Sequence, residues 1–323
     1  MHTHTLLPTL LLMEWKRQTA FALGALAVSL QHPDGVAVRA ASSVAHAQSV
    51  DPAQKAPTYV TSKDGTRIGF DRTGEGPVLV LVAGALSDRS STTRLAALLS
   101  ERSTVINYDR RGRGESTDTL PYAVEREVED IEALIDAAGG SASVFGHSSG
   151  AVLALEAAAR LPAKVRKQVL FEPPFVVDDS RPRVPEDFVA HIDELIAAGK
   201  RGDAVAYFMT DAVGVPAEFV DGMKKSPMWA AMERTAHTLA YDGRLMGDTQ
   251  AGKPLPAERW KTAKAPALVL SGGASEPWLH AAAEALAALL PDAEHRVLEG
   301  LDHAAAVMAA EKLVPVLAEF LAD

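Results

Sequence analysis

Short apolar runs alternate with amphipathic segments along most of the chain. The runs are continuous and rich in β-branched residues, a composition typical of strands buried on both faces of a parallel sheet. The segments between them have a helical pattern, clearest in residues 122–138, where apolar side chains recur three and four positions apart. The buried strands predicted in this way are residues 78–82, 103–108, 141–145, 165–171 and 267–270. Strands that alternate with helices predict a parallel sheet covered on both faces.

Further strands are predicted at both ends of this series. Residues 59–62 and 66–72 flank a turn at Gly65 and predict a hairpin. Residues 295–298 form a short last strand after a helix at 280–290, and Pro315 suits the first turn of a closing helix. The predicted fold class is therefore α/β, with a mostly parallel eight-stranded sheet and helices on both of its faces.

The alternation stops after the sixth predicted strand. Residues 173–262 contain no predicted buried strand, and Pro and Gly punctuate their helical segments. These segments are residues 188–198, 204–211 and 228–240. A long helical insertion at the carboxyl end of a strand predicts a lid over a site. The predicted organisation is a core of residues 56–172 and 263–323 with residues 173–262 as its helical lid.

Residues 1–55 have the features of a leader segment. Lys16 and Arg17 precede an apolar run, residues 19–30, that is too short to span a bilayer, and Ala45-His46-Ala47 forms an A-x-A cleavage site. This pattern predicts a signal peptide, an exported (periplasmic or secreted) protein and no integral membrane segment in the mature chain. The long gap between the apolar run and the A-x-A site favours the alternative, a cytoplasmic protein with a disordered leader.

Composition narrows the classes of function. The chain has 323 residues and a net charge of −10, and an acidic chain without a basic run argues against nucleic acid as a partner. Cysteine is absent, so thiol catalysis, disulfides and thiolate metal ligands are excluded. The sequence has no H-E-x-x-H and no G-x-x-x-x-G-K-[ST] motif, so no metal and no cofactor is predicted. The expected partner is a small-molecule substrate.

A Gly-x-Ser-x-Gly motif lies between a predicted strand and a predicted helix, at Gly146, Ser148 and Gly150. This context is what a nucleophile elbow requires, because a tight turn must hold the serine hydroxyl clear of the backbone. A Cβ at either glycine would collide where strand and helix cross. The helix that starts near Ser149 would also direct free N–H groups at the reaction centre. Ser148 is therefore the candidate nucleophile, and the alternative is an ordinary Gly/Ser turn.

With the elbow, three other segments make residues 58–322 resemble the α/β-hydrolase family. They are the Ala83-Gly84-Ala85 turn, the loop 109–114 with its Asp-Arg-x-Gly-x-Gly pattern, and the late Asp302-His303. The resemblance implies the chain order nucleophile, acid, histidine. It implies His303 as the base, since the family places its histidine in the loop after the last strand. His147 is expected to point away from the nucleophile and to support the site by packing.

The resemblance leaves two positions open for the acid, which orients the imidazole and stabilises its protonated form. The commoner position follows the seventh strand, where the chain offers Glu276 and no aspartate. The other position, used in haloalkane dehalogenases, follows the sixth strand, where Glu172 closes an apolar run ahead of two prolines. The oxyanion donors implied by the resemblance are the backbone N–H groups of Ala85 and Ser149.

The predicted function is hydrolysis of a small ester or lactone through an acyl-enzyme. A serine at the elbow argues against the dehalogenases and epoxide hydrolases of this fold, which have an aspartate there. Cleavage of an amide, or of a C–C bond beside a carbonyl, is an alternative with the same residues. A non-catalytic ligand receptor is another, because fold does not dictate function. Lid side chains that could line an acyl pocket are Phe175, Phe208, Met209, Met228 and Trp229. The alternative, which is commoner for such side chains, is that they form the core of the lid itself.

Overall fold

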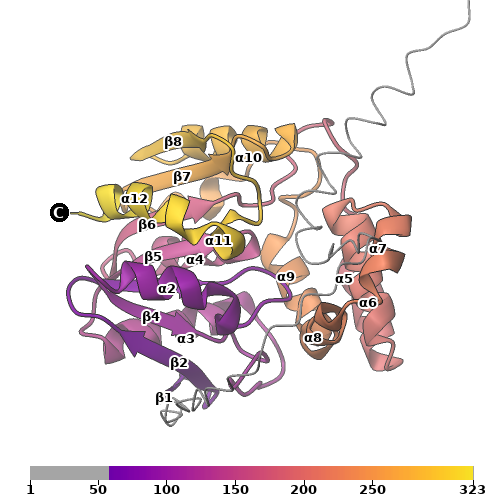
Figure 1. Ribbon diagram of the computed structural model, residues 1–323, viewed down its shortest axis with the longest axis horizontal. Helices are drawn as coiled ribbons and strands as arrows, with labels where there is room; N and C mark the ends of the chain where they lie inside the picture. Colours follow the sequence, from indigo (N-terminus) through magenta and orange to yellow (C-terminus); the bar gives the residue numbers. More distant parts are fainter. Residues whose placement is uncertain (1–57, 323) are drawn as a thin grey trace, which may run out of the picture. The chain divides into compact units, whose positions relative to one another are not determined.

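The computed structural model describes residues 58–322, and the apolar runs of the sequence form its central sheet (Figure 1). The strands are β1 (Thr58–Thr61), β2 (Arg67–Thr73), β3 (Val78–Val82), β4 (Thr104–Tyr108), β5 (Ala142–His147), β6 (Val165–Phe171), β7 (Ala267–Gly272) and β8 (Ala293–Leu298). Their order across the eight-stranded sheet is β1-β2-β4-β3-β5-β6-β7-β8. Strand β2 pairs antiparallel with β1 and β4, and the pairs from β4 to β8 are parallel. The predicted fold class is confirmed.

Helices cover both faces of the sheet because successive strand residues point to opposite sides. Val80 and Val144 belong to the apolar core on one face, and Leu81 and Phe145 belong to the core on the other. The first face is covered by α3 (Val124–Ala137), α4 (Ser149–Arg160) and α10 (Pro277–Leu289). The second is covered by α2 (Thr93–Leu99), which follows the short η1 (Arg89–Thr92), and by α11 (Ala305–Met308) and α12 (Ala310–Leu321).

The insertion, residues 173–266 between β6 and β7, is helical and has an apolar core of its own. Its elements are α5 (Phe188–Ala197), α6 (Arg201–Tyr207), η2 (Phe208–Val213), α7 (Ala217–Met223), α8 (Pro227–Thr235), η3 (Ala236–Thr238), α9 (Leu239–Met246) and η4 (Ala257–Arg259). Figure 1 shows α5 to α8 beside one end of the sheet. Helix α9 packs against both α4 and α5, so it joins the insertion to the core.

Local structure departs from the sequence prediction at two places. Pro315 lies inside α12 and not in its first turn, so that prediction was wrong. The helix tolerates the lost N–H because Leu313 and Leu317 hold it against the sheet. The single helix expected at 228–240 is divided into α8, η3 and the start of α9.

The predicted leader, residues 1–55, lies outside the described residues, so the signal peptide and export stay predictions. Within residues 58–322, the structure contains no helix with the length and apolar character needed to cross a membrane.

Candidate active site

The Gly-x-Ser-x-Gly motif forms a tight turn between β5 and α4. Ser148 has φ 57° and ψ −128°, a conformation that few side chains adopt, and its N–H donates to the carbonyl of Phe171 at 2.9 Å. A Cβ at Gly146 would come within 2.3 Å of the Gly150 oxygen, and a Cβ at Gly150 within 2.2 Å of the Val82 oxygen. The glycines therefore permit the crossing of strand and helix, and Ser148 remains partly exposed at the carboxyl edge of the sheet.

A histidine–carboxylate pair lies at the same edge. His303, in the loop between β8 and α11, hydrogen-bonds through Nδ1 to Glu172 Oε2 at 2.7 Å. The other oxygen of Glu172, Oε1, accepts from the Gly272 N–H at 2.7 Å. Glu172 directly follows β6, has φ 49° and is fully buried, whereas the His303 side chain is 41% exposed. The carboxylate is thus fixed at both oxygens, and it orients the imidazole with Nε2 as the remaining nitrogen.

The second candidate carboxylate, Glu276, has a different setting. It is the residue before α10, and its side chain does not cap the helix. Within residues 58–322 it forms no hydrogen bond with His303, which pairs with Glu172. The structure therefore brings Glu172 and His303 together and leaves Glu276 apart from this pair.

His147 links the elbow to the His303 loop. Its Nε2 lies 2.8 Å from the backbone oxygen of His303, and the two rings are 4.7 Å apart between centroids. Burial, together with the nearby His303, lowers the pKa of His147 from 6.5 to about 3. The ring is therefore neutral at ordinary pH and donates through Nε2–H to that oxygen. This contact places the residue before Ser148 directly against the backbone of the candidate base.

The turn after β3 packs against the nucleophile. A Cβ built on Gly84 would lie 3.0 Å from the Ser148 Cβ, so the turn and the elbow are in close contact. The N–H groups of Ala85 and Ser149 donate no hydrogen bond within residues 58–322. Leu86, the next residue in the turn, has φ 56°, which is uncommon for a side chain of its kind. Two free donors therefore flank the contact between turn and elbow.

A buried ionic cluster supports this turn from behind. Arg113 Nη1 donates to the Gly84 oxygen at 2.6 Å, and its Nη2 donates to Asp242 Oδ2 at 2.8 Å. Asp242 Oδ1 accepts from Arg110 Nη1 at 2.8 Å, and Arg110 forms a bidentate pair with Glu127 at 2.7 Å. Burial alone would raise the pKa of Asp242, but Arg113 and Arg110 outweigh it and hold that pKa below its usual value.

Sequence reasoning missed most of this cluster. The loop 109–114 was noted as a family marker, but its arginines and Asp242 were given no role. The signal present was the concentration of three arginines in a loop directly after a buried strand, where their side chains lie close to the sheet. Asp242 carried no such signal, since it looks like one polar residue on an insertion helix.

The side chains expected to line an acyl pocket are dispersed. Phe175 is fully buried and packs against Trp260 with 5.4 Å between ring centroids, so it is a core residue, which is the commoner role for such side chains. Met209 and Trp229 belong to the insertion's apolar core, Phe208 packs against that core, and Met228 is 53% exposed.

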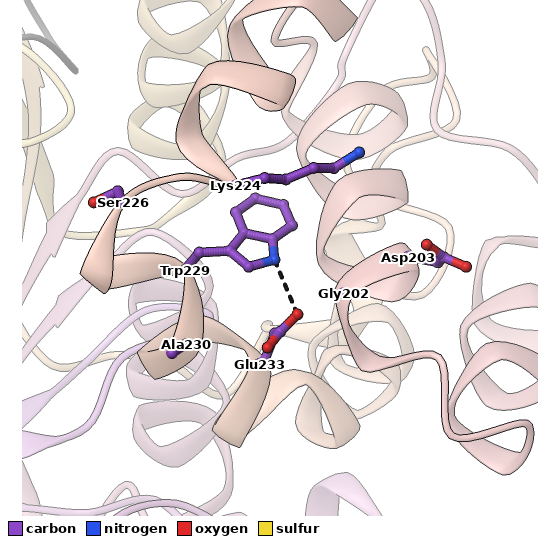
Figure 2. A pocket seen from close by; sticks show the side chains of 7 residues that line it. All are labelled: Gly202, Asp203, Lys224, Ser226, Trp229, Ala230 and Glu233. Carbon is purple, nitrogen blue, oxygen red and sulfur yellow. Dashed lines mark hydrogen bonds between the residues drawn. The ribbon is translucent and has the colours of Figure 1, made fainter.

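A surface pocket of about 480 Å³ lies within the insertion (Figure 2). It is lined by Gly202, Asp203, Lys224, Ser226, Trp229, Ala230 and Glu233. Figure 2 shows the Trp229 indole directed at Glu233, and its Nε1 donates to that carboxylate at 3.0 Å. This pocket includes none of the candidate catalytic residues. In the part of the chain from 58 to 322, no group of three or more His, Cys, Asp or Glu side chains is arranged to hold a metal ion.

Comparison with known proteins agrees with this architecture. A model of the alpha/beta hydrolase family matches residues 79–316. The crystal structure of an alpha/beta hydrolase from Sphaerobacter thermophilus is 50% identical, with a TM-score of 0.76 over 82% of this chain and 100% of that chain. A 2-(acetamidomethylene)succinate hydrolase from Mesorhizobium japonicum is 30% identical over 249 residues, which are 71% of this chain and 82% of that protein.

Other curated relatives are much longer than the match. The chain spans 12% of polyketide synthase ThaQ from Burkholderia thailandensis, at 28% identity over 80% of its own length. It spans 42% of the uncharacterized hydrolase YraK from Bacillus subtilis, at 34% identity over 34% of its own length. The family model, in contrast, matches most of the described residues, and the chain belongs to the alpha/beta hydrolase family.

Proposed function

We propose that the protein is a serine hydrolase in which Ser148 attacks a carbonyl carbon and becomes acylated. His303 accepts the hydroxyl proton at Nε2 and then donates it to the leaving group. Glu172 holds the imidazole through Nδ1 at 2.7 Å and stabilises its charge. The observation that carries the proposal is this hydrogen-bonded pair, with Glu172 fully buried, at the same edge of the sheet as the elbow. Within residues 58–322 Ser148 and His303 are not hydrogen-bonded, and such contacts often tighten when substrate binds.

The N–H groups of Ala85 and Ser149 are the proposed donors to the oxyanion that forms on attack. Their support is position: one follows β3, the other begins α4, and the turn and elbow touch at Gly84 and Ser148. A preorganised donor of this kind contributes roughly 3 kcal/mol to stabilising the transition state.

The proposed substrate is a small ester or lactone, enclosed by the insertion acting as a lid. Ala85 and Leu86 pack against the apolar core of the insertion, so helical residues cover the turn that carries a proposed donor. When the acyl-enzyme forms from an ester, the alcohol portion leaves as an alkoxide that His303 can protonate. Acylation is therefore easier than with an amide, whose nitrogen is a poorer leaving group.

An amide is the second candidate, and one comparison favours it. The relative from Mesorhizobium japonicum, 30% identical over most of its length, is named as the hydrolase of an acetamido compound. The same nucleophile, base and oxyanion donors serve both reactions, because each passes through a tetrahedral intermediate and an acyl-enzyme.

The test of the function is hydrolysis of p-nitrophenyl acetate, butyrate and octanoate and of an N-acetyl amide. Each substrate is measured with the wild type and with Ser148→Ala. We expect turnover of an ester in the wild type and a loss of about 1,000-fold or more in the variant. Mass spectrometry after a fluorophosphonate should find one adduct, on Ser148. Turnover of the amide alone would select the second candidate. Equal activity in wild type and Ser148→Ala, or labelling elsewhere, would contradict the proposal.

A further inference from the structure

Arg113 holds one side of a peptide plane whose other side carries a proposed oxyanion donor. The Gly84 carbonyl and the Ala85 N–H belong to the same peptide, and in a trans peptide these two groups point in opposite directions. Arg113 Nη1 donates to that carbonyl at 2.6 Å and to the Ser87 oxygen at 3.3 Å. A fixed carbonyl therefore fixes the direction of the Ala85 N–H.

The turn needs such support. Gly84 has no Cβ and can rotate its peptide at little steric cost. Leu86, two residues later, has φ 56°, a left-handed conformation that is sterically unfavourable for a residue other than glycine. The Arg113 contacts to Gly84 and Ser87 bracket this strained residue, so they hold a turn that its own sequence favours weakly.

Asp242 in turn holds Arg113. Its Oδ2 accepts from Arg113 Nη2 at 2.8 Å, and both side chains are buried. The Nε of Arg113 is buried and has no hydrogen-bond partner among residues 58–322. Asp242 is thus the carboxylate that compensates the charge of Arg113. Without Asp242, the buried Arg113 guanidinium would be paired only with the carbonyl oxygens of Gly84 and Ser87.

The same carboxylate is linked through Arg110 to the side chain of Ser149, whose N–H is the second proposed donor. Asp242 Oδ1 accepts from Arg110 Nη1, which lies 3.4 Å from both the Ala83 oxygen and the Ser149 Oγ. Arg110 is anchored on its other side by Glu127 of α3. The Gly84–Ala85 peptide, through its carbonyl, and the Ser149 side chain therefore contact one ionic cluster. Asp242 is the member of that cluster from the insertion.

We propose that Arg113 and Asp242 are positioning residues that fix the Ala85 N–H as an oxyanion donor, so that docking of α9 on α4 completes the site. The inference rests on the proposed function for its catalytic consequence. It assigns the insertion a second role, since a segment that covers the site also sets the geometry of its oxyanion hole. Neither side chain is required to touch the substrate.

The chain offers a matched control in the same loop. Arg111 forms a bidentate pair with Asp130 at 2.8 and 2.7 Å, and both side chains are buried. This pair resembles Arg113–Asp242 in burial and in charge, although Arg111 also pairs with Asp64 at 2.9 Å. Within residues 58–322 it makes no hydrogen bond with the 83–87 turn. Asp130→Asn therefore reports what the loss of a buried carboxylate does to the fold alone.

The kinetic test compares Asp242→Asn, Arg113→Lys and Asp130→Asn in the full chain, with the ester that the wild type hydrolyses best. We expect the first two to lower kcat about 100-fold. KM should stay within about threefold, because the lost interaction forms in the transition state. Binding of an alkyl boronic acid, whose tetrahedral adduct on Ser148 places an oxygen in the oxyanion hole, should weaken in proportion. Asp130→Asn should keep kcat within about threefold.

Arg113→Lys keeps the inference testable if Asp242→Asn fails to fold, because lysine retains a cation beside Asp242 but cannot span the carbonyl as well. Wild-type kcat and boronate affinity in both folded variants, or an equal loss of kcat in Asp130→Asn, would overturn the inference.

A crystal structure of Arg113→Lys gives a readout independent of turnover. We expect the Gly84–Ala85 peptide to be rotated or in two orientations, and an unchanged peptide would overturn the inference. If Ser148→Ala hydrolyses the ester as well as the wild type does, the proposed function fails, and the peptide orientation still decides the structural part.

Discussion

The loops after β6 and β7 each carry a glutamate, and they use it differently. Glu172 follows β6 in a left-handed conformation, is fully buried and spends both carboxylate oxygens on His303 and the Gly272 N–H. Glu276 lies four residues beyond β7, is partly exposed and has no such partners within residues 58–322. Strand β7 contributes a backbone group to the pair of Glu172 and His303, namely the Gly272 N–H that donates to Glu172. The comparison teaches that a carboxylate can orient a histidine where the fold fixes both of the carboxylate oxygens.

The largest expected effect is that of Glu172→Gln. The amide would still accept from the Gly272 N–H, but its own N–H₂ group would face His303 Nδ1 and favour the wrong tautomer. We expect kcat/KM for the ester to fall by about 1,000- to 10,000-fold, as for the same change in a serine triad.

Glu276→Gln is the matched control for that measurement. It changes the same atoms in the neighbouring loop, and we expect kcat/KM within about threefold of the wild type. The reverse ranking, with Glu276→Gln inactive and Glu172→Gln active, would show that the acid lies after β7.

The choice between Glu172 and Glu276 shows how far the site can be predicted from the sequence. Continuous apolar runs predicted the sheet and the Gly-x-Ser-x-Gly motif predicted Ser148, since these features depend on neighbours along the chain. The acid stayed ambiguous because its identity depends on contacts to His303 and Gly272, which lie 131 and 100 residues away. Asp242 was not found at all, since its partner Arg113 is 129 residues distant and its helix has an ordinary amphipathic pattern. Pro315 was misplaced because packing on the sheet overrode its local preference.

Gly272→Ala tests the backbone contribution of β7 and should have the next largest effect. A Cβ there would meet the Leu301 oxygen at 2.4 Å and the Asp302 nitrogen at 2.9 Å, both in the loop that carries His303. We expect the free energy of unfolding to fall by about 1–3 kcal/mol, the usual cost of overpacking, and activity to fall as His303 is displaced. Urea denaturation and ester kinetics measure the two effects.

Gly273→Ala serves as its control. The added Cβ would lie 3.0 Å from the Glu299 Oε2 and 3.1 Å from its Cα, which are wider contacts than those at Gly272, and Glu299 is exposed. We expect a smaller loss of stability and unchanged activity. Equal losses in both variants would mean that the loop after β7 is sensitive as a whole, and that Gly272 has no particular role.

The effect that is smallest at neutral pH concerns the third support of His303, from β5. His147 has a pKa lowered to about 3 in the folded protein, against 6.5 in the unfolded chain. The unfolded state therefore binds more protons between these values, and stability is lost as pH falls from about 6.5 toward 3. The slope from this residue is at most about 1.4 kcal/mol per pH unit. His147→Gln, which keeps a donor for the His303 oxygen but does not titrate, should reduce the slope by that amount in urea denaturation at pH 4, 5, 6 and 7. An identical slope in the variant would mean that His147 is protonated in the folded protein, and the neutral donor assigned to it would be wrong.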